Sequence, residues 1–229
     1  MRFLAMSKLV QCMACLLLVS AASPPFAQTT TSAVVAQSPE DGGPRRWEAV
    51  GGKLRLFGAA SLDADVIEIF ADGAVLSNLG CSEILQTVWC EVRALRGKPQ
   101  GFAVATGLRP AVGPDNVVPM GIDDSKHRAG RRDFDAKTNI ACAQDEGEAL
   151  GTCLAQVARS DGGDATLVVT FANGFARKLF FVHGEFVRAS ATMSGVGTDT
   201  TWQLTEGTYF IRVDDQRYEV PEHLIVTRN

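Results

Sequence analysis

The chain has 229 residues, 46% of them hydrophobic, with 22 basic and 26 acidic side chains and a formal net charge of −4. This length is enough for two domains with buried cores. The acidic balance argues against a nucleic-acid partner, because binding to phosphates depends on Lys and Arg, and it argues equally against anionic membrane surfaces.

Residues 1–27 have the pattern of a secretory signal peptide. Arg2 and Lys8 form the basic start, residues 9–22 are mostly apolar, and small residues follow. We expect cleavage after Ala27, with Ala21 as the alternative, and a periplasmic or secreted mature protein with 20 basic and 26 acidic residues and a charge of −6. A spanning helix needs about 20 apolar residues. No later stretch has them, so we expect no integral membrane segment after signal removal.

The cysteines predict two disulfide bonds. A C-x-x-C pair in the signal would be removed with it, which leaves four cysteines in the mature chain. An even number in an exported protein implies disulfides, and four cysteines allow three pairings. We favour Cys81–Cys90 and Cys142–Cys153, because each pair brackets a short polar or turn-like stretch. Each bond would close a loop of roughly ten residues and add about 2–3 kcal/mol of stability.

Residues 28–46 are rich in Thr, Ser, Ala and Pro and show no hydrophobic periodicity. Such a segment buries too little apolar surface to offset the entropy lost on ordering it. We therefore expect a flexible tail.

Residues 47–112 contain short β-like runs separated by turn signals such as Asp72-Gly73. This pattern predicts a small five-stranded β-barrel in an all-β protein. The expected strands cover residues 54–57, 66–70, 74–79, 88–92 and 101–104. The expected core is made of apolar side chains on these strands: Phe57, Ile67, Ile69, Val75, Trp89, Val92, Phe102 and Val104.

Three motifs of this region resemble those of bacterial SH3-like (SH3b) domains. Trp89-Cys90-Glu91-Val92 matches a W-x-x-V pattern, Gly101-Phe102-Ala103-Val104 stands where the family commonly has Gly-Trp-Val, and Gly107-Leu108-Arg109-Pro110 matches a Y-L-R-P-like end. The resemblance implies a binding module, and family members often bind cell-wall peptides or glycan. The candidate ligand-binding residues are Phe57, Trp89 and Phe102, with core packing of Trp89 as the alternative.

Residues 113–133 are predicted to be a linker. Residues 126–132 form a basic cluster, Lys-His-Arg-Ala-Gly-Arg-Arg. We favour a solvated linker; contact with an acidic wall polymer and a site for proteolysis are the alternatives.

Residues 134–229 are predicted to form a second antiparallel β-domain without helices of normal length. Asn173-Gly174 is a strong hairpin signal between two apolar runs. Further strands are expected at 186–192, 200–205, 208–213 and 217–220, with a short closing turn or strand at 222–226. The motifs Phe134-Asp135-Ala136 and Ile140-Ala141-Cys142-Ala143-Gln144 resemble a C-terminal region of exported proteobacterial proteins, a resemblance that implies no activity.

No catalytic or metal-binding constellation is recognised. The three histidines, His127, His183 and His223, have no ligand spacing, and we expect no metal and no cofactor. Asp123-Asp124, Asp214-Asp215 and Glu219 are interpreted mainly as turn chemistry and solvation. Trp202 and Tyr209 are candidates for stacking on sugars or peptides, although core packing is favoured for both.

These observations predict an exported, non-catalytic binding protein of the bacterial cell envelope, and we expect a monomer. Its SH3-like domain would recognise peptidoglycan or an envelope protein. One alternative is a periplasmic inhibitor of a hydrolase, which would present a rigid loop such as residues 195–200. The other alternative is a hydrolase that the motifs do not reveal.

Overall fold

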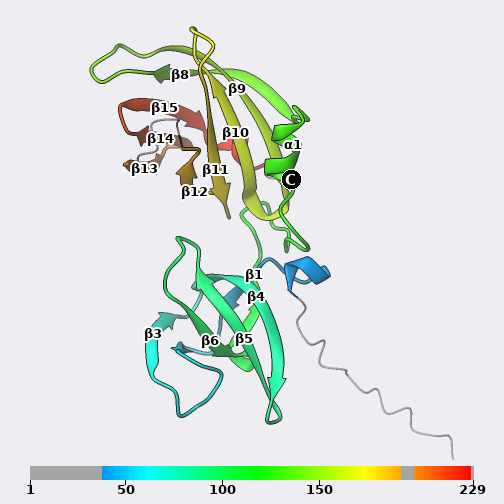
Figure 1. The fold of residues 1–229 in the computed structure, drawn as a ribbon. Helices are drawn as coiled ribbons and strands as arrows, with labels where there is room; N and C mark the ends of the chain where they lie inside the picture. Colours follow the sequence, from blue (N-terminus) through cyan, green and yellow to red (C-terminus); the bar gives the residue numbers. More distant parts are fainter. Residues whose placement is uncertain (1–37, 192–198, 228–229) are drawn as a thin grey trace, which may run out of the picture. The chain divides into compact units, whose positions relative to one another are not determined.

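The computed structural model describes residues 38–191 and 199–227, so the expected signal peptide lies outside the described residues. The chain forms two antiparallel β-sheets (Figure 1). Strand order in the first sheet is β3-β2-β6-β5-β4-β1-β7. Its strands are β1 (Arg46–Ala49), β2 (Lys53–Phe57), β3 (Val66–Ala71), β4 (Val75–Ile84), β5 (Thr87–Ala94), β6 (Gln100–Val104) and β7 (Leu108–Pro110). Two short 3-10 helices, η1 (Pro39–Asp41) and η2 (Ala105–Gly107), accompany them.

The first sheet curls around one small core. Trp47 on β1 and Leu54 on β2 belong to the same buried cluster, although three strands separate β1 from β2 in the sheet order. Leu56, Leu76 and Val92 fill the space between them. This sheet has seven strands where the sequence predicted five, because β1 and β7 pair with each other and extend it beyond β4.

The second sheet has the strand order β12-β11-β10-β9-β8-β15-β14-β13. Its strands are β8 (Ala136–Ala143), β9 (Gly151–Ser160), β10 (Asp164–Thr170), β11 (Ala176–Val182), β12 (Glu185–Ala189), β13 (Thr200–Thr205), β14 (Thr208–Val213) and β15 (Gln216–Pro221). Three short helices accompany it: α1 (Ser125–Gly130), η3 (Asp161–Gly163) and α2 (Glu222–Ile225). Residues 222–226 were expected to form a short closing turn or strand, and most of them form α2 instead.

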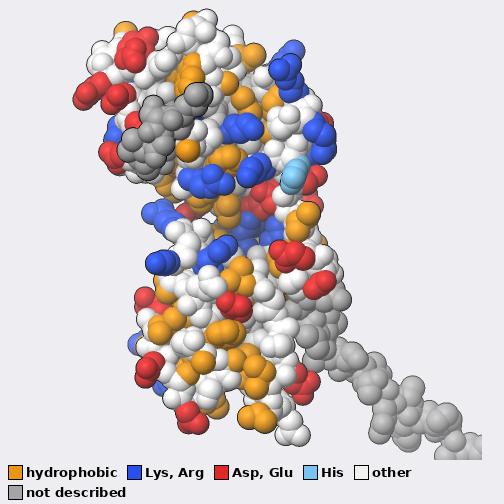
Figure 2. Space-filling model, viewed as in Figure 1, with side chains coloured by type: hydrophobic (Ala, Val, Ile, Leu, Met, Phe, Trp, Pro, Cys, Tyr) orange, Lys and Arg blue, Asp and Glu red, His pale blue; other side chains and the backbone are white. Residues whose placement is uncertain are grey.

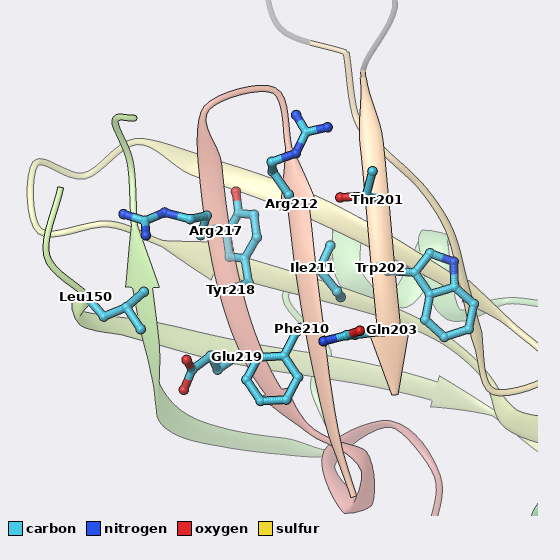
Figure 3. Close-up of a pocket in the computed structure, with 10 residues that line it drawn as sticks. All are labelled: Leu150, Thr201, Trp202, Gln203, Phe210, Ile211, Arg212, Arg217, Tyr218 and Glu219. Carbon is cyan, nitrogen blue, oxygen red and sulfur yellow. The ribbon is translucent and has the colours of Figure 1, made fainter. Parts of the chain in front are cut away.

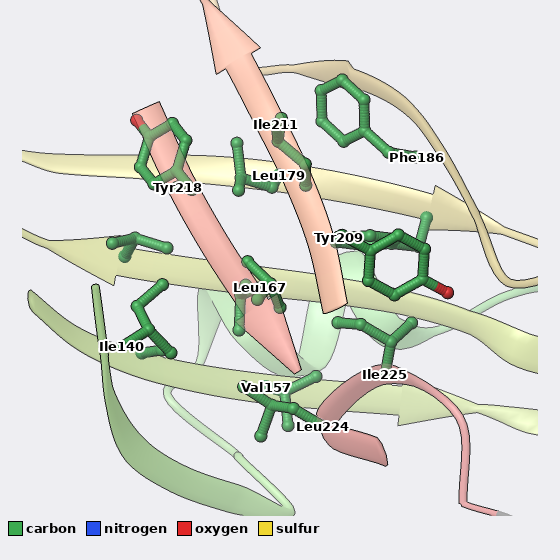
Figure 4. Close-up of a cluster of buried hydrophobic side chains, with 14 of the residues drawn as sticks. Ile140, Val157, Leu167, Leu179, Phe186, Tyr209, Ile211, Tyr218, Leu224 and Ile225 are labelled. Carbon is green, nitrogen blue, oxygen red and sulfur yellow. The ribbon is translucent and has the colours of Figure 1, made fainter. Parts of the chain in front are cut away.

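The second sheet also curls so that strands far apart in its order meet (Figure 4). The rings of Phe181 on β11 and Tyr209 on β14 lie 5.3 Å apart. Tyr209 also donates a hydrogen bond to the carbonyl of Gly184, at 2.5 Å. Leu224 and Ile225 of α2 belong to the same core.

Both predicted disulfides are confirmed, one in each sheet. Cys81 on β4 is the cross-strand partner of Cys90 on β5, and their Cα atoms lie 4.0 Å apart. Cys142 on β8 and Cys153 on β9 are bonded across a Cα separation of 5.9 Å. The predicted all-β class, with two antiparallel units that each carry a disulfide, is therefore correct.

The predicted core of the first sheet is wrong at five positions: Val75, Phe102 and Val104 are only half-buried, and Ile67 and Ile69 are exposed. Ile67 and Ile69 are 45% and 51% exposed. They lie on β3, which is the edge strand of the sheet and has a partner on one side only. Leu54 and Leu56 on the neighbouring strand β2 are buried in their place.

Two segments expected to lack structure also differ from the prediction. Pro39–Asp41 and Arg46, in the predicted tail, belong to η1 and β1. The predicted linker contains α1, whose Ser125 and Ala129 are buried. Within its basic cluster, Arg128 forms ion pairs with Asp133 and Asp135 at 2.9 and 2.5 Å.

A buried ion cluster surrounds Asp164, at the start of β10. Its carboxylate pairs with the guanidinium groups of Arg45, at 3.0 Å, and of Arg46, and it accepts a hydrogen bond from the amide of His183. The side chains of Arg46 and Asp164 are 4% and 1% exposed. A charge buried to this extent is costly unless it is paired.

We predict that Asp164→Asn lowers the free energy of unfolding by about 3–5 kcal/mol, because the substitution leaves Arg46 buried without its counter-ion. Chemical denaturation of the full chain measures this. Asp161→Asn is the matched control, since that carboxylate is exposed and its loss should change stability by no more than about 0.5 kcal/mol. Equal effects of the two substitutions would contradict a stabilising role for the cluster.

Candidate functional site

A hollow of about 340 Å³ lies on the outer face of strands β13, β14 and β15 (Figure 3). Side chains alternate between the two faces of a strand. Tyr209, Ile211 and Val213 on β14 point into the core, so Phe210 and Arg212 between them point outward. The hollow is lined by Leu150, Thr201, Trp202, Gln203, Phe210, Ile211, Arg212, Arg217, Tyr218 and Glu219.

The strand register arranges the outward side chains in two rows. Gln203, Phe210 and Glu219 are consecutive cross-strand partners and form the first row, which we call the aromatic row. Phe210 stands in the middle of this row, and 39% of its large apolar side chain is exposed. A ring in this position offers its face to a ligand, with an amide on one side and a carboxylate on the other.

Thr201, Arg212 and Arg217 form the second row, which we call the arginine row. Figure 3 shows both guanidinium groups on the same side of Phe210. The two arginines come from adjacent strands and are direct cross-strand partners. The hollow therefore combines an apolar platform with two arginine side chains, whose guanidinium groups point in different directions in Figure 3.

Neighbouring groups hold the two arginines only in part. Arg212 donates to the carboxylate of the exposed Asp199 and to the carbonyl of Asp214, both at 2.9 Å. Arg217 donates from one terminal nitrogen to the carbonyl of Glu148. Among the described residues, the buried Nε of Arg217 has no hydrogen-bond partner. A buried donor without a partner is unfavourable.

Among the described residues that line the hollow, Glu219 is the one carboxylate. Tyr218 faces the core, where burial raises the pKa of its hydroxyl above the ordinary value and keeps it protonated. That hydroxyl donates to Gln216 at 2.6 Å.

The structure brings together the three ligand-binding residues predicted in the first sheet. Phe57 and Phe102 are cross-strand partners, and the rings of Phe57 and Trp89 pack edge to face at 5.5 Å. Phe57 and Trp89 are 4% and 3% exposed, whereas Phe102 is half-buried. Most of the surface of the first two rings is therefore used in packing.

The first sheet instead exposes apolar side chains around its edge strand (Figure 2). Leu62, in the loop before β3, is 70% exposed, and Val66 on β3 is 44% exposed. Together with Ile67 and Ile69 they form what we call the β3 patch. The amide of Ile69 donates to the carboxylate of Glu68 at 3.0 Å.

Two of the acidic sequence candidates, Asp214 and Asp123, accept hydrogen bonds from neighbouring groups. Asp214 holds the turn between β14 and β15, where it accepts hydrogen bonds from Arg177 and from the amide of Asp199. Asp123 accepts from the amide of Ser125, and burial raises the pKa of its carboxyl. The pKa of His183 is lowered mainly by burial of its imidazole and to a smaller extent by the positive charge of Arg46.

The aromatic candidates of the second sheet pack into its core, as favoured from the sequence. Tyr209 is buried, and the ring of Trp202 lies 6.0 Å from it. The loop 195–200, expected to protrude in an inhibitor, lies mostly outside the described residues. Across residues 38–191 and 199–227, no group of three His, Cys, Asp or Glu side chains could hold a metal ion.

Phe210, Arg212 and Arg217 were not predicted from the sequence. Arg212 between two apolar residues was a usable signal, whereas Phe210 stands in the apolar run Tyr209-Phe210-Ile211 and is not set apart from its inward neighbours. The pairing of Arg212 with Arg217 was not visible, since it depends on the register of the hairpin between β14 and β15.

Comparison with protein-family models, with curated proteins and with solved structures finds no match to this chain. In the part of the chain that the structure describes, no helix is long and apolar enough to cross a membrane. The function is therefore argued from the hollow and the fold.

We predict that Phe210→Ala lowers the free energy of unfolding by about 1 kcal/mol or less, because the ring lies on the outer face of the sheet. Phe181→Ala is the comparison, and it should cost about 3–5 kcal/mol, because that ring is buried in the core. Thermal and denaturant unfolding of both variants measure the difference. A loss of the same size in both would mean that Phe210 serves folding.

Proposed function

We propose that this protein is an exported, non-catalytic binding protein of the bacterial envelope that recognises peptidoglycan at the hollow of its second sheet. The observation that carries the proposal is the exposed ring of Phe210 between Gln203 and Glu219. A sugar ring has apolar C–H faces that pack on an aromatic face. Its hydroxyls both donate and accept hydrogen bonds, which an amide and a carboxylate can satisfy from either side.

The two disulfide bonds and the expected signal peptide support a location outside the cytoplasm, because structural disulfides persist in oxidising compartments. The site differs from the one that the sequence suggested in the SH3-like region. The rings of Phe57 and Trp89 are almost fully buried against other side chains, whereas the ring of Phe210 lies outside the core and is exposed. We therefore favour the hollow over the SH3-like region as the glycan site.

A second candidate function is recognition of an envelope protein by the first sheet. The β3 patch supports it, because exposed apolar side chains at a sheet edge can take up a further strand. The two functions use different surfaces, so substitutions can separate them.

We predict that the full mature chain pellets with purified peptidoglycan and that Phe210→Ala reduces the pelleted fraction at least severalfold. Loss of the ring removes the stacking platform while leaving the core unchanged. Ile69→Lys on the β3 patch and Phe102→Ala at the SH3-like site are the matched controls. Both should pellet like the wild type.

Each alternative result has a clear meaning. Equal pelleting of Phe210→Ala and the wild type would remove the hollow as the wall site. Loss of pelleting in Phe102→Ala alone would return the site to the SH3-like region. If the wild type does not pellet, peptidoglycan recognition itself is wrong, and recognition of an envelope protein by the β3 patch becomes the working hypothesis.

A further inference from the structure

We propose that Arg212 and Arg217 bind a carboxylate group carried by the saccharide ligand. The inference rests on the proposed function, because it names the part of the ligand that the arginine row would hold. It also makes the site selective, since an uncharged saccharide would gain nothing from this row.

The first argument is the placement of two like charges side by side. Arg212 and Arg217 are direct cross-strand partners, and the Cβ atoms of such partners lie about 4.5–5.5 Å apart. Like charges directly opposite one another destabilise a sheet. Asp199 offsets part of this repulsion at Arg212, and an anionic ligand group at the arginine row would offset more of it.

The second argument is the incomplete satisfaction of the two guanidinium groups. Among the described residues, Arg217 donates from one terminal nitrogen to the carbonyl of Glu148, so its other terminal nitrogen is the one that a ligand could meet. The ion pair between Arg212 and Asp199 involves a carboxylate that is 74% exposed, and such surface pairs contribute little. A carboxylate matches the fork of N–H donors that a guanidinium presents.

The third argument is the spacing between the two rows. Two residues along a strand span about 6.5–7 Å, so the arginine row lies that far from the aromatic row on the same face. This is about the distance from the centre of a hexose ring to the end of an ether-linked acid on that ring. A sugar stacked on Phe210 can therefore place an acidic substituent on Arg212 and Arg217.

The site favours a saccharide over an acidic peptide. Phe210 and both arginines lie on β14 and β15, which are each paired on both sides, whereas the free edge nearest to them in the sheet order is on β13. A ligand over β14 and β15 is held by side chains, and the planar amide of Gln203 and carboxylate of Glu219 suit hydroxyl groups.

Two disaccharides that differ by one carboxylate test the proposal. N-acetylglucosaminyl-N-acetylmuramic acid carries a lactyl carboxylate, and N,N′-diacetylchitobiose lacks it. Calorimetric titration of the full mature chain should show at least about tenfold tighter binding of the first, as expected for one or two charge-assisted hydrogen bonds. The preference should shrink as salt is raised.

Variants assign the preference to the arginine row. Arg212→Gln and Arg217→Gln should each remove most of the preference for the acidic disaccharide, and thermal unfolding of each variant checks that it is folded. Arg217→Lys keeps the charge but loses the fork, so it should retain part of the preference. Arg93→Gln, at an exposed position on β5, is the control and should behave like the wild type.

The outcomes separate this inference from the proposed function. Equal binding of the two disaccharides, unaffected by the arginine substitutions, would overturn the inference and leave glycan recognition standing. Binding of neither disaccharide would overturn both. Binding of an acidic stem-peptide fragment instead of the disaccharides would show that the arginine row serves a peptide, which also overturns the inference.

Discussion

The second sheet depends on a contact across its own interior. Phe181 on β11 and Tyr209 on β14 lie 5.3 Å apart between ring centroids, although four strands separate β11 from β14 in the sheet order. This contact requires the sheet to curl and turns one face of β14 inward. Because side chains alternate along a strand, it also turns Phe210 and Arg212 outward. The alternation of side chains along β14 therefore places one set of residues in the core and the other set in the hollow.

Strong local patterns made much of the fold predictable. The hairpin signal at Asn173-Gly174 is confirmed by a turn in which the Gly174 amide donates to the carbonyl of Phe171 at 2.9 Å. Strands β8 and β9 were missed, because Ala and Gly occupy many of their positions and weaken the alternation that marks a strand. The exposure of Ile69 was missed for another reason, since whether β3 lies at an edge depends on the long-range strand order.

The hollow was less predictable than the fold, because neighbouring strands assemble it. Residues 208–213 alone do not show that Phe210 faces away from the core, because Tyr209, Phe210 and Ile211 are all apolar. The position of Phe210 between Gln203 and Glu219 depends on two turns that fix the register. At the first of them, Glu206 and Gly207 both have positive φ, as the tightest hairpin turns require. Sequence motifs directed attention to the aromatic residues of the first sheet, where the rings are used for packing.

We propose that the outer face of β13, β14 and β15 is the ligand-binding surface. The most direct test is amide and arginine-Nε NMR of the full mature chain, titrated with a soluble peptidoglycan disaccharide. Our account predicts that the signals of Phe210, of Arg212 and of the Arg217 Nε shift together and saturate at one affinity. Shifts confined to β2, β3 and β6 of the first sheet, with β14 and β15 unchanged, would contradict it.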